Sequence, residues 1–276
     1  MPRPELQRFV LDMLTDGGLA DQQCLEGADG KPYCACSTTT GGGCEGGLEC
    51  QVDPDGLPGC FCSPSNQVGC DPGLMCEEVQ NGNSACYPPV IVKGRVFDLG
   101  TDEPIEGAHV LARDANNVAV SDVAVSGADG SYELGVRNPR DADGGLLNND
   151  VTLRADAAGY QTFPLPPRSA IPFDTSSAVG DPPVLESSVT DIALIALPDS
   201  SGLGSVSGAV LDAAAAGTLV VVGGSANGGG VSGVAGFDGT YTVFNVSAGN
   251  VAVHGYKVGL QLDPTSADAP TTACLA

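Results

Sequence analysis

GADGSYELGV, at residues 127–136, is the stretch that decides the fold of this chain. Its Asp129-Gly130 pair stands between two runs in which apolar and polar residues alternate. Asp-Gly readily adopts the positive φ angles that a tight hairpin turn requires, and Tyr132 then begins the returning strand. The stretch therefore predicts a β-hairpin.

Similar segments lie on both sides of this hairpin. β-Branched alternation begins after Tyr87-Pro88-Pro89, where a preceding run of cysteines stops. Seven short strands separated by turn residues are typical of a β-sandwich. Residues 137–150 and 166–187 are longer than this pattern requires, and we expect them to be exposed loops. The expected strands are residues 90–98, 108–113, 118–125, 132–136, 151–155, 160–165 and 189–197.

Three motifs in this region resemble the carboxypeptidase regulatory-like domain, which is a transthyretin-like sandwich. GRVFDLGTDEPIEGAHVLA at 94–112 resembles the first hairpin of that family, and GADGSYELGV resembles its central Asp-Gly turn. AAGYQT at 157–162 resembles its Gly-Tyr strand. The resemblance covers residues 90–197 and implies an accessory sandwich without catalytic residues.

A shorter second copy of this unit is predicted after residue 204. Gly208-x-Val210 repeats Gly94-x-Val96, and FDGTYTVFNV at 237–246 repeats the Asp-Gly-x-Tyr turn. Residues 249–262 predict two final strands, and nothing after Leu262 resembles the last strand of the first copy. We therefore expect an incomplete, less stable second sandwich with an unpaired C-terminal sheet edge that can bind another strand.

Ten of the eleven cysteines share one period of 26 residues. CEGGLEC at 44–50 aligns with CDPGLMC at 70–76. Small loops of this kind cannot bury a core and are held together by disulfides in oxidising compartments. We predict five disulfides within the block and leave their connectivity open. The ten residues are Cys24, Cys34, Cys36, Cys44, Cys50, Cys60, Cys62, Cys70, Cys76 and Cys86.

Zinc is the alternative for a cysteine-rich block. Structural zinc sites favour Cys-x2-4-Cys pairs, often with histidine. This block instead has Cys-x-Cys pairs, no histidine and gaps of five to nine residues. We therefore predict no metal and no other cofactor. The pattern is similar to the epidermal-growth-factor-like and dickkopf/colipase-like modules of extracellular proteins, although its spacing matches neither.

The composition favours an all-β protein outside the cell or on its surface. With 39 Gly, 20 Pro and no Trp, the chain is typical of short strands joined by tight turns. Its net charge of −23 repels phosphate and anionic lipid, which argues against nucleic-acid binding. No apolar run reaches the length of about 20 residues that spans a membrane.

Four parts are expected along the chain. The first is a short amphipathic helix with a linker, unlike the apolar core of a signal peptide. Either the leader lies outside this sequence or export uses another route. The expected boundaries are 1–23 for the helix and linker, 24–89 for the cysteine-rich module, 90–198 for the first sandwich and 204–276 for the second.

No catalytic constellation is recognisable, and we expect no enzymatic activity. Zinc carboxypeptidases need a His-x-x-Glu pair, which neither His109 nor His254 begins. Asp141, Asp143 and Asp150 are candidate calcium ligands, but their spacing departs from the EF-hand pattern at Gly145-Leu146.

These features predict an extracellular or cell-surface structural or adhesive module whose partner is a protein or a glycan. The alternatives are a carbohydrate-binding protein and an accessory fragment of a larger secreted enzyme such as a carboxypeptidase. Sugar sites commonly use exposed aromatic rings, and the candidates here are Tyr87, Phe163, Phe173 and Tyr256.

Two residues near the C-terminus carry further predictions. Cys274 is the one cysteine outside the periodic block, so we expect it to be unpaired within the monomer and available for intermolecular pairing. Asn245 begins the N-glycosylation sequon Asn-Val-Ser, which has meaning in a eukaryotic secretory pathway.

Overall fold

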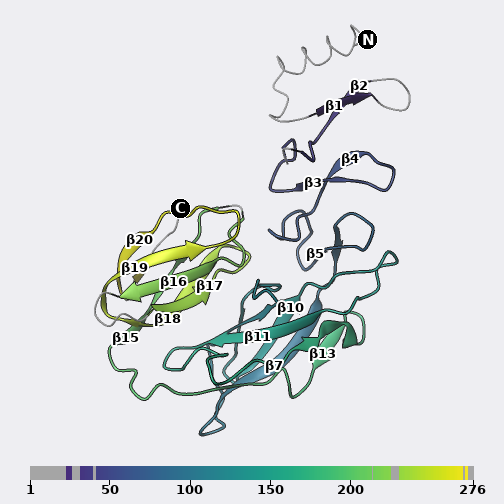
Figure 1. Cartoon of the computed structure of the whole chain (residues 1–276). Coiled ribbons are helices and arrows are strands. Elements are labelled where there is room, and N and C mark those ends of the chain that lie inside the picture. Colours follow the sequence, from purple (N-terminus) through teal and green to yellow (C-terminus); the bar gives the residue numbers. More distant parts are fainter. Residues whose placement is uncertain are drawn as a thin grey trace. The chain divides into compact units, whose positions relative to one another are not determined.

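The computed structural model describes residues 23–26, 32–39, 42–212, 214–224, 230–269 and 271–272. It divides the chain into two compact units (Figure 1). Unit 1 comprises Met1–Tyr87 with Arg140–Gly145, and unit 2 comprises Pro88–Pro139 with Leu146–Ala276. The described residues form strands and one short 3-10 helix, which confirms the prediction of an all-β chain. The helix expected near the N-terminus lies outside them.

Unit 1 contains three hairpins, which follow one another along the chain (Figure 1). In each hairpin, a cysteine of the first strand lies directly opposite a cysteine of the second, as Cys50 lies opposite Cys60. The strands are β1 (Gln23–Glu26), β2 (Pro32–Ala35), β3 (Glu49–Val52), β4 (Pro58–Phe61), β5 (Met75–Glu77) and β6 (Ala85–Tyr87).

Disulfides hold these hairpins together. Each cysteine of the second and third hairpins is bonded to a cysteine 14 or 16 residues before it. A bridge that closes a loop of this length contributes about 3 kcal/mol in the chain-entropy account. The four pairs are Cys36–Cys50, Cys44–Cys60, Cys62–Cys76 and Cys70–Cys86.

A distant loop completes unit 1. The Nε of Arg140 donates to Oε2 of Glu77 at 2.5 Å, and the side chains are 8% and 0% exposed. The guanidinium also lies 4.7 Å above the ring of Tyr87, and Arg140 N donates to Glu78 O. The expectation of an exposed loop at 137–150 is therefore wrong at Arg140, because the buried carboxylate of Glu77 needs a cation.

The first sandwich of unit 2 has two sheets packed around one core. One sheet has the order β10-β7-β13, with β14 also pairing β7, and the other has the order β12-β11-β8-β9. The strands are β7 (Val90–Asp98), β8 (His109–Arg113), β9 (Ala124–Val125), β10 (Ser131–Val136), β11 (Asp150–Asp156), β12 (Phe173–Asp174), β13 (Val184–Glu186) and β14 (Ile192–Leu194).

Three predicted segments of this sandwich need correction. Residues 160–165 make only isolated bridges, because the nearby prolines at 164, 166 and 167 have no N–H to donate. Of residues 118–125, only the last two form a strand, β9. Of residues 189–197, only the central part forms a strand, β14. The expected loop at 166–187 contains β12, the helix η1 (Thr175–Ser177) and β13, which are too short to show a sequence period.

The second sandwich repeats this topology. Its sheets have the orders β18-β15-β21 and β17-β16-β19-β20, and Figure 1 shows most of these strands. Both Asp-Gly turns need their glycines: a Cβ at Gly130 would lie 2.4 Å from Val96 O, and one at Gly239 would lie 2.8 Å from Val210 O. The strands are β15 (Leu203–Ala209), β16 (Leu219–Gly224), β17 (Gly230–Val234), β18 (Thr240–Ser247), β19 (Gly249–Tyr256), β20 (Thr265–Ala269) and β21 (Thr271–Thr272).

The C-terminal tail contributes to both sheets of this sandwich. β20 pairs antiparallel with β19, and β21 pairs parallel with β15. The expectation that no strand follows Leu262 is therefore wrong, because backbone pairing does not require the apolar alternation that marks the earlier strands. Residues 249–262 form the single strand β19 and a turn instead of two strands. Cys274 lies outside the described residues.

No helix in the described part of the chain is long and apolar enough to cross a membrane.

Candidate functional site: the groove between the two sandwiches

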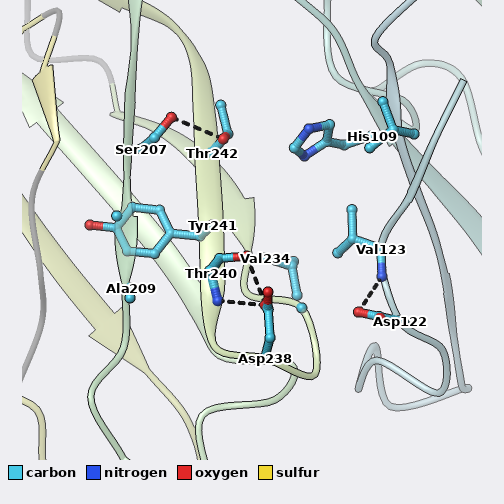
Figure 2. Close-up of a pocket in the computed structure, with 13 residues that line it drawn as sticks. His109, Asp122, Val123, Ser207, Ala209, Val234, Asp238, Thr240, Tyr241 and Thr242 are labelled. Carbon is cyan, nitrogen blue, oxygen red and sulfur yellow. Dashed lines mark hydrogen bonds between the residues drawn. The ribbon is translucent and has the colours of Figure 1, made fainter. Parts of the chain in front are cut away.

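A groove of about 520 Å³ lies between the two sandwiches of unit 2. Figure 2 shows side chains of the first sandwich facing those of the second across it. The first sandwich contributes His109, Asp122, Val123 and Val125, and the second contributes Ser207, Gly208, Ala209, Val234, Gly236, Asp238, Thr240, Tyr241 and Thr242.

The polar side chains of the groove are engaged in local structure. Asp122 Oδ1 accepts from the backbone N–H groups of Val123 and Phe237, both at 2.8 Å. Asp238 Oδ1 accepts from Thr240 N at 2.8 Å and from Thr240 Oγ1 at 2.7 Å. These carboxylates hold turns, and one of them joins the two sandwiches through Phe237.

His109 occupies a half-buried position in β8, at the side of the groove. Its ring meets Phe244 edge-on, with ring centroids 4.9 Å apart. Burial lowers the pKa of His109 below its ordinary value, and the nearby Asp156 opposes this shift. The groove hydroxyl of Ser207 lies 3.0 Å from that of Thr242, so this serine is paired with a second hydroxyl and not with a base.

Asn245 connects the second sandwich to a turn of the first. Its Oδ1 accepts from Gly159 N at 2.7 Å, and its Nδ2 donates to Ala157 O at 3.0 Å and Tyr160 O at 2.8 Å. Asn245 Nδ2, the nitrogen that an N-linked glycan would modify, thus donates hydrogen bonds to two carbonyl groups. The asparagine of the sequon therefore joins the second sandwich to the first.

A β-bulge directs Asn245 toward that turn. Gly204 pairs with Val246 and Ser205 pairs with Phe244, which leaves Asn245 as the extra residue of β18. Its φ of +61° lies in the left-handed region, which asparagine tolerates better than most residues. The sequence therefore places here one of the few side chains that fit both the backbone and the contact.

A buried ion pair in β11 makes a further connection to the other sandwich. Arg154 donates to both carboxylate oxygens of Asp156, at 2.7 and 3.1 Å, and the side chains are 8% and 6% exposed. Arg154 Nη2 also donates to Ser232 O in β17 at 2.7 Å. Thr162 Oγ1 donates to Asp156 at 2.6 Å. The pair therefore links the two sandwiches through Ser232.

The aromatic candidates do not form a common platform. Phe173 lies in the core of the first sandwich, and Phe163 packs under the guanidinium of Arg168 at 4.8 Å. Tyr87 belongs to unit 1, where it lies under Arg140. Tyr256 is 57% exposed and stacks on His254, at a centroid distance of 6.3 Å.

The acidic candidates for calcium are divided between the units. Asp141 and Asp143 lie in the loop that belongs to unit 1, whereas Asp150 begins β11 in unit 2. Asp141 Oδ1 accepts from Asp143 N at 2.9 Å and from Gly145 N at 2.7 Å. This carboxylate therefore holds its own turn.

Comparison with known proteins assigns no family. No family model matches the chain, and no curated protein matches it. Similar solved structures include the Bacillus anthracis TIE protein, with 12% identity and a TM-score of 0.25 over 68% of this chain and 34% of that protein. A streptococcal ancillary pilin shows 15% identity and a TM-score of 0.26 over 73% of each chain.

A mutant of the shaft pilin SpaA from Lactobacillus rhamnosus GG shows 9% identity and a TM-score of 0.28, over 68% of this chain and 96% of the pilin. The chain thus spans about a third of the length of the TIE protein, at 34%. At these TM-scores, the similarities do not assign a function.

Several residues that organise these contacts carried no functional signal in the sequence. Arg154 lies in the predicted strand 151–155 and Asp156 directly follows it, and alternation there predicts only a face of a sheet. Glu77 and Arg140 are 63 residues apart. Of these residues, only Asn245 carries a sequence signal, which is its sequon.

Proposed function

We propose that this chain is an extracellular or cell-surface structural or adhesive module without catalytic activity. The observation that carries the proposal is the repeated set of four disulfides in unit 1. Such bonds persist in oxidising compartments and stabilise segments with too small a core to fold alone. Unit 2 then presents two sandwiches whose surfaces are available to a protein or glycan partner.

The bonding in the groove supports a non-catalytic role. A hydrolase needs a nucleophile within hydrogen-bond reach of a base, and the base in turn needs an orienting group. In the described groove, Asp122 and Asp238 are engaged by backbone N–H groups, and Ser207 is engaged by Thr242.

We also propose that both sandwiches belong to the carboxypeptidase regulatory-like, transthyretin-like family. The Asp-Gly-x-Tyr turn stands at the same place in each, before β10 in the first and before β18 in the second. Apart from β14, which has no counterpart among the described strands of the second sandwich, their strand orders correspond, which supports an origin by duplication.

Carbohydrate binding in the groove is the second candidate. The hydroxyls of Ser207, Thr240 and Thr242 line one wall, and sugar recognition uses such hydrogen-bonding groups. The aromatic ring in this wall, Tyr241, is only 4% exposed, so it offers no stacking surface. This candidate is therefore weaker than a protein partner.

The location is tested on intact producing cells. A membrane-impermeant biotin reagent should label the protein, and alkylation without prior reduction should leave the eight bridged cysteines of unit 1 unmodified. Protein found only inside intact cells, with these cysteines free, would contradict the proposal.

The binding role is tested with the purified oxidised chain on a glycan array and on immobilised cell-surface and matrix proteins. Thr242→Arg fills the groove, and Thr101→Arg places the same side chain at an exposed site on the first sandwich. Glycan binding lost only in Thr242→Arg would favour the second candidate. Turnover of peptide, ester or glycoside substrates would refute a non-catalytic module.

A further inference from the structure

Two carboxylates from different sandwiches meet at one end of the groove. A Cβ built on Gly236 would lie 2.8 Å from Asp122 Oδ1 and 3.3 Å from Asp238 Oδ1, so both oxygens lie close to the same glycine. Figure 2 shows Asp122 on the side of the first sandwich and Asp238 on the side of the second. Negative charge is therefore concentrated where the two sandwiches face each other.

The equivalent turn of the first sandwich has one carboxylate at this position. Its Gly127 corresponds to Gly236, and a Cβ built there would lie 3.3 Å from Asp129 Oδ1. The three atoms nearest to that Cβ all belong to Asp129 and Ser131 of the same turn. The Asp-Gly turn therefore forms with a single carboxylate, and the second one, that of Asp122, is particular to the groove.

No cation of the described residues neutralises these two carboxylates. Asp122 and Asp238 each accept hydrogen bonds through Oδ1, and their Oδ2 atoms accept none from the described residues. Neither forms an ion pair with a described residue, and the groove lining contains no described Lys or Arg. Burial lowers the pKa of the lining His109 below its ordinary value of 6.5, so this imidazole adds no positive charge at neutral pH.

Apolar side chains line the same groove as these carboxylates. Val123, Val125 and Val234, here called the groove valines, belong to its lining, and Val125 is 57% exposed. Arginine and lysine have an apolar stem and a charged head, and they bury the stem along apolar surface. The groove therefore offers contacts to both parts of such a side chain.

We propose that this groove binds an arginine side chain of a partner protein, with its aliphatic stem beside the groove valines and its guanidinium between Asp122 and Asp238. The guanidinium has five donors around one plane and can serve two carboxylates at once, which the compact ammonium of lysine does less well. The volume of about 520 Å³ is in the ordinary range for ligand sites. The inference rests on the proposed binding of a protein partner and names the side chain that the groove takes.

Two other occupants fit the groove less well. An inorganic cation would contact the carboxylates but leave the groove valines exposed to water. A neutral sugar would use the hydroxyls of Ser207, Thr240 and Thr242 but bring no positive charge to the carboxylates. An arginine side chain accounts for both features, because it supplies the charge and the apolar stem together.

The test titrates a short peptide into the full, oxidised and isotopically labelled chain. The probe is the acetylated and amidated peptide Gly-Ser-Arg-Ser-Gly, and its control carries citrulline, which has the shape of arginine without its charge. NMR follows the amides of Val123, Phe237 and Thr240, whose N–H groups donate to the two carboxylates. We expect saturable shifts of these amides with the arginine peptide and none with the citrulline peptide.

Matched variants locate the contact. Asp122→Asn and Asp238→Asn each remove one charge and keep an oxygen that accepts from the same N–H groups, so we expect both to fold. Asp129→Asn removes the same charge from the equivalent turn, outside the groove. We expect each groove variant to weaken binding of the arginine peptide by about threefold or more and Asp129→Asn to leave it unchanged.

Val125→Lys is an independent variant, because it leaves both carboxylates in place and puts a cation of the chain itself in the groove. It should abolish binding of the arginine peptide. The inference is overturned if the arginine and citrulline peptides act equally, if Val125→Lys binds as the wild type does, or if Asp129→Asn weakens binding as much as Asp122→Asn. Shifts produced by calcium chloride and not by the arginine peptide would also overturn it. None of these results bears on labelling at the cell surface, so the proposed location is decided separately.

Discussion

Asn245 shows how one side chain can join two domains when the backbone presents it correctly. The bulge in β18 gives the residue a positive φ, and its amide group then reaches a donor and two acceptors in the turn 157–160 of the first sandwich. All three bonds are lost together if the side chain is removed.

We predict that Asn245→Gly destabilises unit 2. Glycine keeps the left-handed backbone, so the change isolates the side-chain bonds, whose loss leaves Gly159 N without this acceptor. The expected loss is about 1–3 kcal/mol in the free energy of unfolding, measured with urea. Asn250→Gly, at an exposed position in β19, is the control. Equal effects of the two changes would contradict a positioning role for Asn245.

His109 gives unit 2 a dependence on pH. Burial lowers its pKa in the folded chain below the ordinary value of 6.5, so the unfolded chain takes up this proton first as the pH falls. The contribution to stability is complete above pH 6.5 and is lost as the pH falls from there to the lowered pKa. The edge contact with Phe244 is the one most directly affected.

The measurement compares thermal unfolding of the wild type, His109→Gln and His254→Gln between pH 7.5 and pH 5. We expect the wild type and His254→Gln to lose more stability than His109→Gln over this range, because carboxylates contribute equally to all three. An identical loss in His109→Gln would show that this residue does not carry the effect.

The disulfides of the second and third hairpins of unit 1 have a fixed spacing in the sequence. A cysteine in the first strand bonds 14 residues back, and a cysteine in the second strand bonds 16 residues back. For Cys24 and Cys34, these positions hold Val10 and Gly18. The β1–β2 register places Cys24 and Cys34 directly opposite one another.

We therefore predict that Cys24 and Cys34 form the fifth disulfide of the block, across their own hairpin. Peptide mapping by mass spectrometry without reduction should recover a linked fragment that contains both. The fragment with Cys50 and Cys36 is the internal control, since its bond is defined in the structure. Alkylated Cys24 or Cys34, or a link from either to another molecule, would disprove the pairing.

On the scale of the whole molecule, the two units are stabilised by different interactions. Unit 1 depends on disulfides and on the Glu77–Arg140 ion pair, whereas each sandwich of unit 2 has an apolar core of its own. The four disulfides defined in the structure all lie in unit 1. Reduction should therefore affect the units unequally.

We predict that a phosphine reductant unfolds unit 1 and leaves unit 2 folded. Hydrogen exchange should lose protection over residues 42–87 and 140–145 and keep it over β7, β10 and β11. The segment 140–145 is the informative one, because it lies in the sequence of the sandwich but belongs to unit 1. Retained protection there after reduction would contradict the assignment.

Features that repeat locally could be predicted from the sequence. The all-β class, the period of the cysteines and the two Asp-Gly-x-Tyr turns follow from composition, spacing and alternation, and β7 has the predicted bounds. These patterns involve neighbours along the chain, so the residues themselves carry the signal. The strands without a period, β13 and β21, were missed because parallel partners distant in sequence define them.

The contacts of the candidate site were decided by the tertiary structure. Asn245 bonds to Ala157 across 88 positions, and Arg140 bonds to Glu77 across 63. The sequence supplied residues able to make such bonds, together with the turns and the cysteine spacing that limit the fold. Only the tertiary fold selects the partners, because hydrogen bonds and ion pairs depend on distance in space and leave no period in the sequence.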